Sequence, residues 1–210
     1  MTRVLSTLAM KGVLQATAPG LDVRFDATQA LLKSIAEGEK ADVVILTVEA
    51  IDKLGYPDPL ALGSCGVGLA VRAGGKRPDI SSLNSFAKAI NNAASIAHSK
   101  VGASGLYFAD LLQRLKLNPK RIIVVERGPV GAVVARGEAE LGVQQLCELA
   151  PVPGIDIVGP FPGEIQSITR FAAAPMPGAH AQEAQRFLAF LRSPEVRAAM
   201  RANLFQPANT

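Results

Sequence analysis

Short apolar segments alternate with amphipathic ones along most of the chain. Residues 41–47 and 122–125 are nearly continuous runs of β-branched and other apolar residues, as in buried parallel strands. Helical spacing of apolar positions is found over residues 48–54 and 181–191. Further strands are predicted at residues 3–7, 21–25, 93–97, 141–144 and 155–158, and further helices at residues 8–16, 30–37, 81–91, 106–112 and 194–203. Strands and helices that alternate through short loops predict an α/β fold.

Two apolar segments are longer than the others. Residues 60–71 read as a strand despite glycines 63, 66 and 68, and residues 166–174 read as a second long strand. A chain of 210 residues suits one large domain or two small lobes. We therefore expect the first long strand to cross into a second lobe and the other to return. The predicted division is lobe 1 over 1–66 plus 160–210, and lobe 2 over 67–159.

Small polar residues separate a strand from a helix at four places. The stretch His98–Leu112 shows the pattern most fully, because a strand runs into a loop of glycines and hydroxyls and then into a helix. Such a junction aims free backbone N–H groups at an anion, although a plain strand-to-helix turn looks the same. In open α/β sheets, ligands lie beyond the carboxyl ends of the strands. The four junctions are Ser6–Thr7, Asp26–Gln29, Gly102–Gly105 and Arg127–Val130.

Composition and charge argue against nucleic-acid binding and against a fold held by disulfides. The net charge is +4, but Lys and Arg are scattered, aromatics make up 5% and Trp is absent, which disfavours nucleic-acid binding. Cys65 and Cys147 lie far apart and read as two small buried residues, not a disulfide framework.

Motifs for catalysis with metals, nucleotides or a nucleophilic serine are missing from the sequence. His98 and His180 are the only histidines, and no metal-ligand spacing occurs around them. Neither a phosphate-binding loop nor a dinucleotide fingerprint is present. The segment Gly102–Gly105 lacks the second spacer of a nucleophile elbow, which disfavours a hydrolase. We expect no metal and no cofactor.

A family resemblance runs through nearly the whole chain. It resembles the molybdate-binding (ModA-like) branch of the type 2 periplasmic binding proteins. Val4–Leu8 is similar to the first ligand loop of that branch, and Gly38–Ile45 to its strand that begins with glycine, a small residue and Ala-Asp-Val. The other similar segments are Val101–Gly105, Ala135–Gly142 and Ala184–Phe205.

The resemblance implies a two-lobed type 2 periplasmic-binding-protein fold, with mixed sheets flanked by helices and two crossing hinge strands. It also implies a small oxyanion or organic carboxylate bound in a cleft between the lobes. The ligand positions of the family fall on Ser6, Thr28, Ser104, Arg127 and Gln145, and Thr7, Gln29 and Gly105 stand beside them at the same junctions.

The chain departs from the molybdate branch at its ligand loops. Asp26–Gln29 replaces paired serines, His98 replaces an aspartate, Arg127 replaces a small apolar residue, and Gln145 replaces a tyrosine. Arginine pairs bidentately with carboxylates. The site therefore suits an organic acid at least as well as molybdate.

An enzymatic alternative stays open. Residues 141–160 are similar to members of this branch that resemble aconitate isomerase. The alternative function is the isomerisation of an unsaturated tricarboxylic acid by allylic proton transfer. His98 and Lys11 are then the candidate catalytic residues.

The N-terminus enters a predicted strand without a charged region and an apolar segment after it. The expectation is a cytoplasmic protein for the sequence as given, and a periplasmic one if a leader was trimmed. The expected partner is a small anion, with an ABC transporter permease in addition if the chain is exported.

Overall fold

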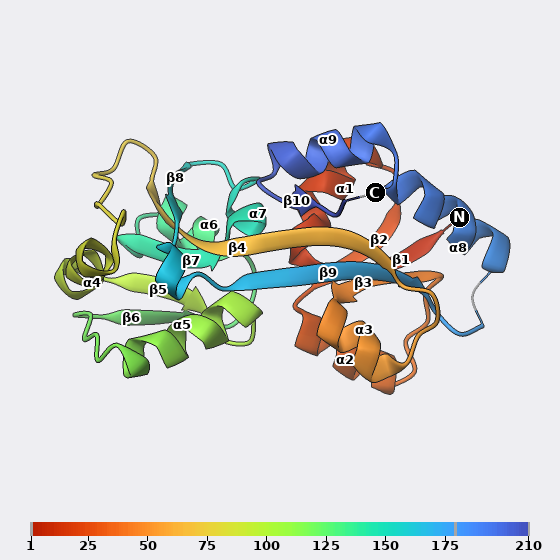
Figure 1. Ribbon diagram of the computed structural model, residues 1–210, viewed down its shortest axis with the longest axis horizontal. Coiled ribbons are helices and arrows are strands. Elements are labelled where there is room, and N and C mark those ends of the chain that lie inside the picture. Colours follow the sequence, from red (N-terminus) through yellow and green to blue (C-terminus); the bar gives the residue numbers. More distant parts are fainter. Residues whose placement is uncertain (1, 179, 210) are drawn as a thin grey trace. The chain divides into compact units, whose positions relative to one another are not determined.

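The computed structural model of the protein describes residues 2–178 and 180–209. The chain divides into two compact units, one made of Met1–Cys65 and Thr169–Thr210 and the other of Gly66–Ile168. It enters the second unit along β4 (Leu60–Arg72) and leaves it at the start of β9 (Ile168–Pro175) (Figure 1). No helix in the described part of the chain is long and apolar enough to cross a membrane.

The return to unit 1 comes later than the expected residue 160. Phe161 and Ile165 lie in the main core of unit 2, where Phe161 packs edge-on against Phe86. The Gln166 side chain then binds both backbone groups of Val67, accepting from its N–H at 2.9 Å and donating to its carbonyl at 3.1 Å. Residues 160–168 therefore belong to unit 2, a correction to the division predicted from the sequence.

Unit 1 is built on a sheet of order β2-β1-β3-β9, in which β1 pairs in parallel with β2 and β3, and β3 pairs antiparallel with β9. The alternating apolar side chains of β1, β3 and β9 form its core, together with those of α2 and α3. A short strand, β10 (Gln206–Pro207), pairs with the first part of β4. The other elements of unit 1 are β1 (Arg3–Thr7), η1 (Leu8–Met10), α1 (Lys11–Thr17), β2 (Asp22–Asp26), α2 (Thr28–Ala36), β3 (Val43–Thr47), α3 (Val48–Leu54), α8 (Ala181–Leu191) and α9 (Pro194–Ala202).

In unit 2, β5 lies between β6 and β7 and is parallel to both, whereas β4 pairs antiparallel with β7 and β8. One core contains the aromatic side chains of α4 and α5, and a smaller one lies under α6. The elements are α4 (Leu83–Asn92), β5 (Ile96–Ser99), α5 (Ala103–Arg114), β6 (Ile122–Val125), α6 (Val130–Ala135), β7 (Leu141–Gln145), α7 (Leu146–Leu149), β8 (Ile155–Pro160) and η2 (Gly163–Ile165). Each unit is thus a mixed sheet flanked by helices.

Asp42 joins three segments of unit 1 just before β3. Its carboxylate accepts a hydrogen bond from the Arg3 amide at 2.8 Å and another from His180 Nδ1 at 2.9 Å. Burial acts to raise the pKa of Asp42, but these hydrogen bonds outweigh it and hold the pKa below its usual value.

Replacing Asp42 by alanine is expected to lower the free energy of unfolding by about 2–3 kcal/mol, because the Arg3 amide then loses a buried, charged acceptor. The loss should shrink as the pH falls below the usual aspartate pKa of 3.8 and toward the lower pKa of the folded protein, where the wild-type carboxylate also becomes protonated. Urea unfolding at pH 7 and pH 3 measures both effects. Asp22→Ala, an exposed aspartate of β2, is the matched control, and an equal loss in both variants would contradict this role.

Candidate functional site

Two hydroxyls predicted as ligand donors lie at the carboxyl end of β1. Ser6 is fully buried and its Oγ donates to the Thr7 carbonyl at 3.0 Å. Thr7 is 3% exposed, and its Oγ1 is one of two buried side-chain atoms in the described residues that have no hydrogen-bond partner. The parallel register pairs Thr7 with Asp26, so this strand end lies directly beside the second predicted junction.

The second junction is more helical than predicted. Helix α2 begins at Thr28, not at residue 30, so half-buried Thr28 and exposed Gln29 lie in its first turn. Neither Asp26 nor Thr28 caps this helix, because the N-cap is Ala27 and has no side-chain cap bond. Asp26 Oδ1 instead accepts from the Ala27 amide at 2.8 Å.

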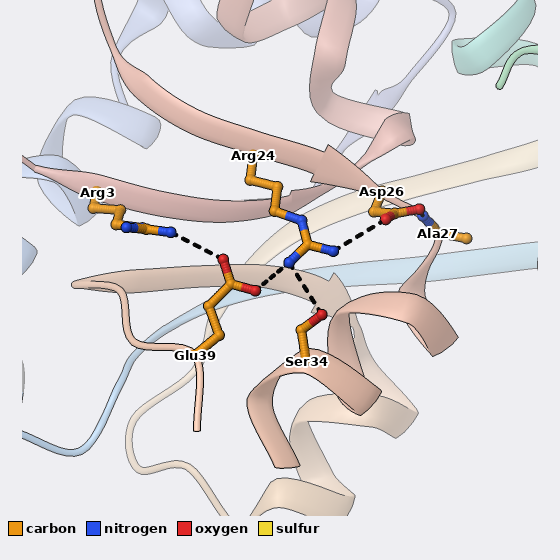
Figure 2. Close-up of polar contacts among 6 residues, drawn as sticks. All are labelled: Arg3, Arg24, Asp26, Ala27, Ser34 and Glu39. Carbon is orange, nitrogen blue, oxygen red and sulfur yellow. Dashed lines mark hydrogen bonds and ion pairs between the residues drawn. The ribbon is translucent and has the colours of Figure 1, made fainter. Parts of the chain in front are cut away.

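An arginine holds the Asp26 carboxylate from its other side. Figure 2 shows the Arg24 guanidinium between Asp26 Oδ2, at 3.3 Å, and Ser34 Oγ, at 3.0 Å. It also pairs with Glu39, which accepts a further hydrogen bond from Arg3 at 3.0 Å. The negative charge of Asp26 is thereby paired within the protein, which leaves Thr28 and Gln29 as the ligand candidates at this junction.

Lys11, a candidate catalytic residue of the enzymatic alternative, is half-buried at the start of α1.

The third junction brings the first turn of α5 against the end of β5. A Cβ added to Gly105 would lie 1.9 Å from the Ser99 carbonyl oxygen, and one added to Gly102 would lie 2.6 Å from Ser99 Oγ. Only glycine permits this approach. Ser104, in the same turn, is 3% exposed, and its hydroxyl, which is not fully enclosed, makes no hydrogen bond in the part of the chain that the structure describes. Ser99 Oγ is the second buried atom without a partner among these residues.

These groups form a cradle of donors at the N-terminus of a twelve-residue helix. The N–H groups of Ala103 and Ser104 precede the first possible helical acceptor and have no partner within the helix. Together with the two serine hydroxyls and the helix dipole, they favour an oxyanion.

His98 lies one residue before Ser99 and is 7% exposed. Its Nδ1 donates to the Ser99 carbonyl at 3.0 Å, since a carbonyl can only accept. The ring packs edge-on against Phe108, with 5.7 Å between centroids. The His98 side chain thus stabilises the end of β5 through a hydrogen bond to Ser99 and a packing contact with Phe108 in the core.

Arg127 follows β6 in an exposed loop, and its guanidinium makes no hydrogen bond or ion pair within the described residues. The loop lies beside the third junction, because Ser99 pairs with Val125 and the Lys100 amide donates to the Val125 carbonyl at 2.9 Å. An exposed ion pair of 3.0 Å joins Lys100 to Glu126. Arg127 itself is available to a ligand.

Two adjacent glutamines end β7 and face opposite sides of the sheet. Gln145 is 3% exposed, and its Oε1 lies 3.7 Å from Cys147 Sγ. Gln144 is 1% exposed, and its Oε1 accepts from the Val130 amide at 2.9 Å. The Gln144 amide nitrogen donates to Glu148 Oε2. Burial raises the pKa of half-buried Glu148 to about 7, despite the opposing effect of this hydrogen bond.

The predicted residues are thus gathered in two sets. Unit 1 brings together Ser6, Thr7, Thr28 and Gln29 at the ends of two parallel strands. Unit 2 brings together Ser104, Gly105, Arg127 and Gln145 at the ends of three.

Sequence reasoning did not select Ser99 or Glu148. Ser99 stands out in the sequence only as a small hydroxyl residue before Gly102. Glu148 could have been found as an acidic residue three positions beyond a buried strand end, but its burial depends on distant segments. No group of three or more potential metal ligands occurs in residues 2–178 and 180–209.

The comparison with known sequences identifies one relative whose match covers nearly the whole chain. The chain is 36% identical over 230 residues to a protein of Pseudomonas sp named "Aconitate isomerase", and the match covers 97% of this chain and 87% of that protein.

Solved structures with the same fold are more distant in sequence. The Azotobacter vinelandii periplasmic molybdate-binding protein superposes with a TM-score of 0.77 at 18% identity, over 100% of both chains. A periplasmic thiamin binding protein superposes with a TM-score of 0.68 at 17% identity, over 99% of this chain and 84% of that one. These likenesses confirm the predicted periplasmic-binding-protein fold.

The family model described as "Bacterial extracellular solute-binding protein" matches residues 9–206. Since this match spans almost the whole chain, the protein belongs to the family of bacterial extracellular solute-binding proteins.

Proposed function

We propose that this protein binds a small organic acid with two or three carboxylates at the strand-end residues described above. The similarity to a protein named for a tricarboxylic acid carries the proposal. The arrangement supports it, because Ser99, Ser104 and the first turn of α5 supply neutral donors while Arg127 supplies a free positive charge. Arginine matches a carboxylate with two parallel hydrogen bonds. An ABC transporter permease is the proposed protein partner for a periplasmic form of the chain.

Arg127→Ala is expected to weaken the binding of trans-aconitate by about 10–100-fold, because a hydrogen-bonded charge pair contributes about 1.5–3 kcal/mol. The melting temperature of the free protein should stay nearly unchanged, since Arg127 has no partner within the described residues. Isothermal titration calorimetry and thermal unfolding measure the two quantities. Arg121→Ala, another exposed arginine of unit 2, serves as control.

A panel of trans-aconitate, cis-aconitate, citrate, molybdate, tungstate and sulfate tests the ligand class. Stabilisation by molybdate and tungstate alone would refute the carboxylate proposal. A large loss of stability in Arg127→Ala would show that this residue is structural. Loss of binding after Arg127→Ala is expected if the set in unit 2 holds the anion, and Thr7→Val and Thr28→Val test the set in unit 1 in the same way.

A second candidate function is the isomerisation of such an acid by allylic proton transfer. The specific observation in its favour is the Glu148 carboxyl, which Gln144 links to the Val130 amide just after the Arg127 loop and whose pKa burial raises to about 7. Proton transfer in catalysis is most efficient when the pKa of the acid or base lies near the working pH. NMR spectra of aconitate incubated with the protein test this function directly.

A further inference from the structure

A chain of two hydrogen bonds sets the orientation of Glu148. The Val130 amide can only donate, so Gln144 must present Oε1 to it, at 2.9 Å. The Gln144 amide nitrogen, a donor, must then face Glu148 Oε2. Oε2 is therefore an acceptor whether the carboxyl is charged or neutral. A proton that binds to Glu148 is placed on Oε1.

The second oxygen is free to exchange that proton. Oε1 makes no hydrogen bond within residues 2–178 and 180–209. The buried side-chain oxygens without a partner in this part of the chain are Thr7 Oγ1 and Ser99 Oγ, so Oε1 is not sealed from solvent. Glu148 thus has one oxygen anchored by Gln144 and one that makes no hydrogen bond within the described residues, and it lies in α7 just beyond the carboxyl end of β7.

Within the described residues, no ion pair joins this carboxylate to a cation. Helix α7 packs against β7 and β8. Strand β7 contains no charged residue, and Asp156 of β8 is bound to the Gly74 amide at 3.1 Å and to Arg77 at 3.4 Å. Helix α6 has no charged side chain, and Arg72 of β4 lies against Gly137. Arg127 lies on the loop just before Val130, whose amide is bound by Gln144. It makes no ion pair within the described residues.

We propose that Glu148 is the base of this protein, and that its Oε1 removes and returns the allylic proton of a bound unsaturated di- or tricarboxylate. The proposal rests on the proposed function and names the group that moves the proton. His98 is a poorer choice, because its Nδ1 is bound to Ser99 and its ring is packed in the core against Phe108.

The step balances without a co-reactant. Oε1 takes a proton from the methylene carbon of the ligand, and the electron pair of the broken C–H bond forms a double bond to the central carbon. The original π pair moves to the far carbon and is delocalised into the carboxylate attached there. Glu148 then returns the proton to the far carbon. The double bond has moved by one position and no electron has been gained or lost.

The test uses the full chain and trans-aconitate in D2O. Proton NMR follows the cis isomer and deuterium uptake, and calorimetry follows binding. Glu148→Gln keeps the acceptor for Gln144 but removes the base, so turnover should fall by about 10²–10⁴-fold while Kd changes less than threefold. The wild-type kcat/KM should rise with pH through about 7, where the Glu148 pKa lies, and this limb should vanish in the residual activity of the variant.

Two further variants make the result specific. Glu148→Asp keeps a displaced carboxylate and should retain more turnover than Glu148→Gln. Glu164→Gln removes an exposed acid of the same unit and should behave as wild type. Binding by the wild type without isomerisation or exchange would overturn the inference and leave the proposed binding intact.

Three other outcomes are also decisive. Turnover of Glu148→Gln within tenfold of wild type would overturn the inference, because another group would then be the base. Loss of binding in that variant would make Glu148 a ligand contact and overturn it as well. A wild-type protein that binds no aconitate would refute the proposed function and, with it, the inference.

Discussion

Gly105→Ala is expected to destabilise the protein by about 3 kcal/mol or more. The new Cβ would lie 1.9 Å from the Ser99 carbonyl oxygen and 2.5 Å from Ser99 Oγ, so α5 must move away from β5. Overpacking of this kind typically costs about 1–3 kcal/mol, and more when backbone must shift. Alanine is otherwise the better helix former by about 1 kcal/mol, so only the clash can produce a loss.

Urea unfolding followed by circular dichroism measures this loss. Gly163→Ala is the matched control, because it lies in the same unit and a Cβ there would meet nothing within 4 Å. Gly105→Ala should also weaken anion binding, since the first turn of α5 carries the free N–H groups. An unchanged or raised stability would show that β5 and α5 do not pack as closely as described.

Glu148→Gln is expected to raise the free energy of unfolding at pH 8 by about 3 kcal/mol, and to leave it nearly unchanged near pH 4.5. Burial raises the pKa of Glu148 from 4.5 to about 7 in the folded protein. Between these values the native state holds more protons than the unfolded state, so wild-type stability falls as the pH rises through 7. Each unit of pKa corresponds to about 1.4 kcal/mol, and glutamine avoids this cost because it cannot ionise.

The measurement is the difference in urea unfolding between variant and wild type from pH 4.5 to pH 8.5. Glu164→Gln, which removes an exposed glutamate, should show no such pH-dependent gain. A constant difference across this range would mean that Glu148 has an ordinary pKa. A gain that develops between pH 4.5 and about 7 and then levels off would show that this glutamate is retained at the expense of stability, as groups with a chemical role often are.

The pattern of apolar and polar positions was sufficient to predict the helices and strands and the α/β fold class. Buried runs such as residues 43–47 became strands, and Ser82 and Ser193 cap α4 and α9 as a serine before a helix suggests. Helix starts were less accurate. Helix α2 begins at Thr28 and α5 at Ala103, two or three residues before their apolar patterns. Small and polar residues of a first turn contribute nothing to such a pattern.

The candidate site was only partly visible in the sequence. The junctions at Thr7, Thr28, Ser104 and Arg127 follow from local order, because the carboxyl ends of parallel strands meet at one edge of a sheet. Their use as ligand contacts is a proposal that the mutations above test. The pairing of Asp26 with Arg24 could not be predicted, since it depends on the side chains that β2 and α2 bring together.

By itself, the sequence determined the alternation of strands and helices, the chain crossing at β4, and the small or polar residues at the four strand-to-helix junctions. These properties depend on neighbouring residues and on periods of two or about four positions. Only the tertiary structure decided that Gly105 contacts Ser99 and that residues 160–168 stay in unit 2. The same holds for the hydrogen bond by which Gln144 binds one carboxyl oxygen of Glu148 and not the other. Burial and hydrogen-bond partners come from segments distant along the chain, so these properties exist only once the units have folded.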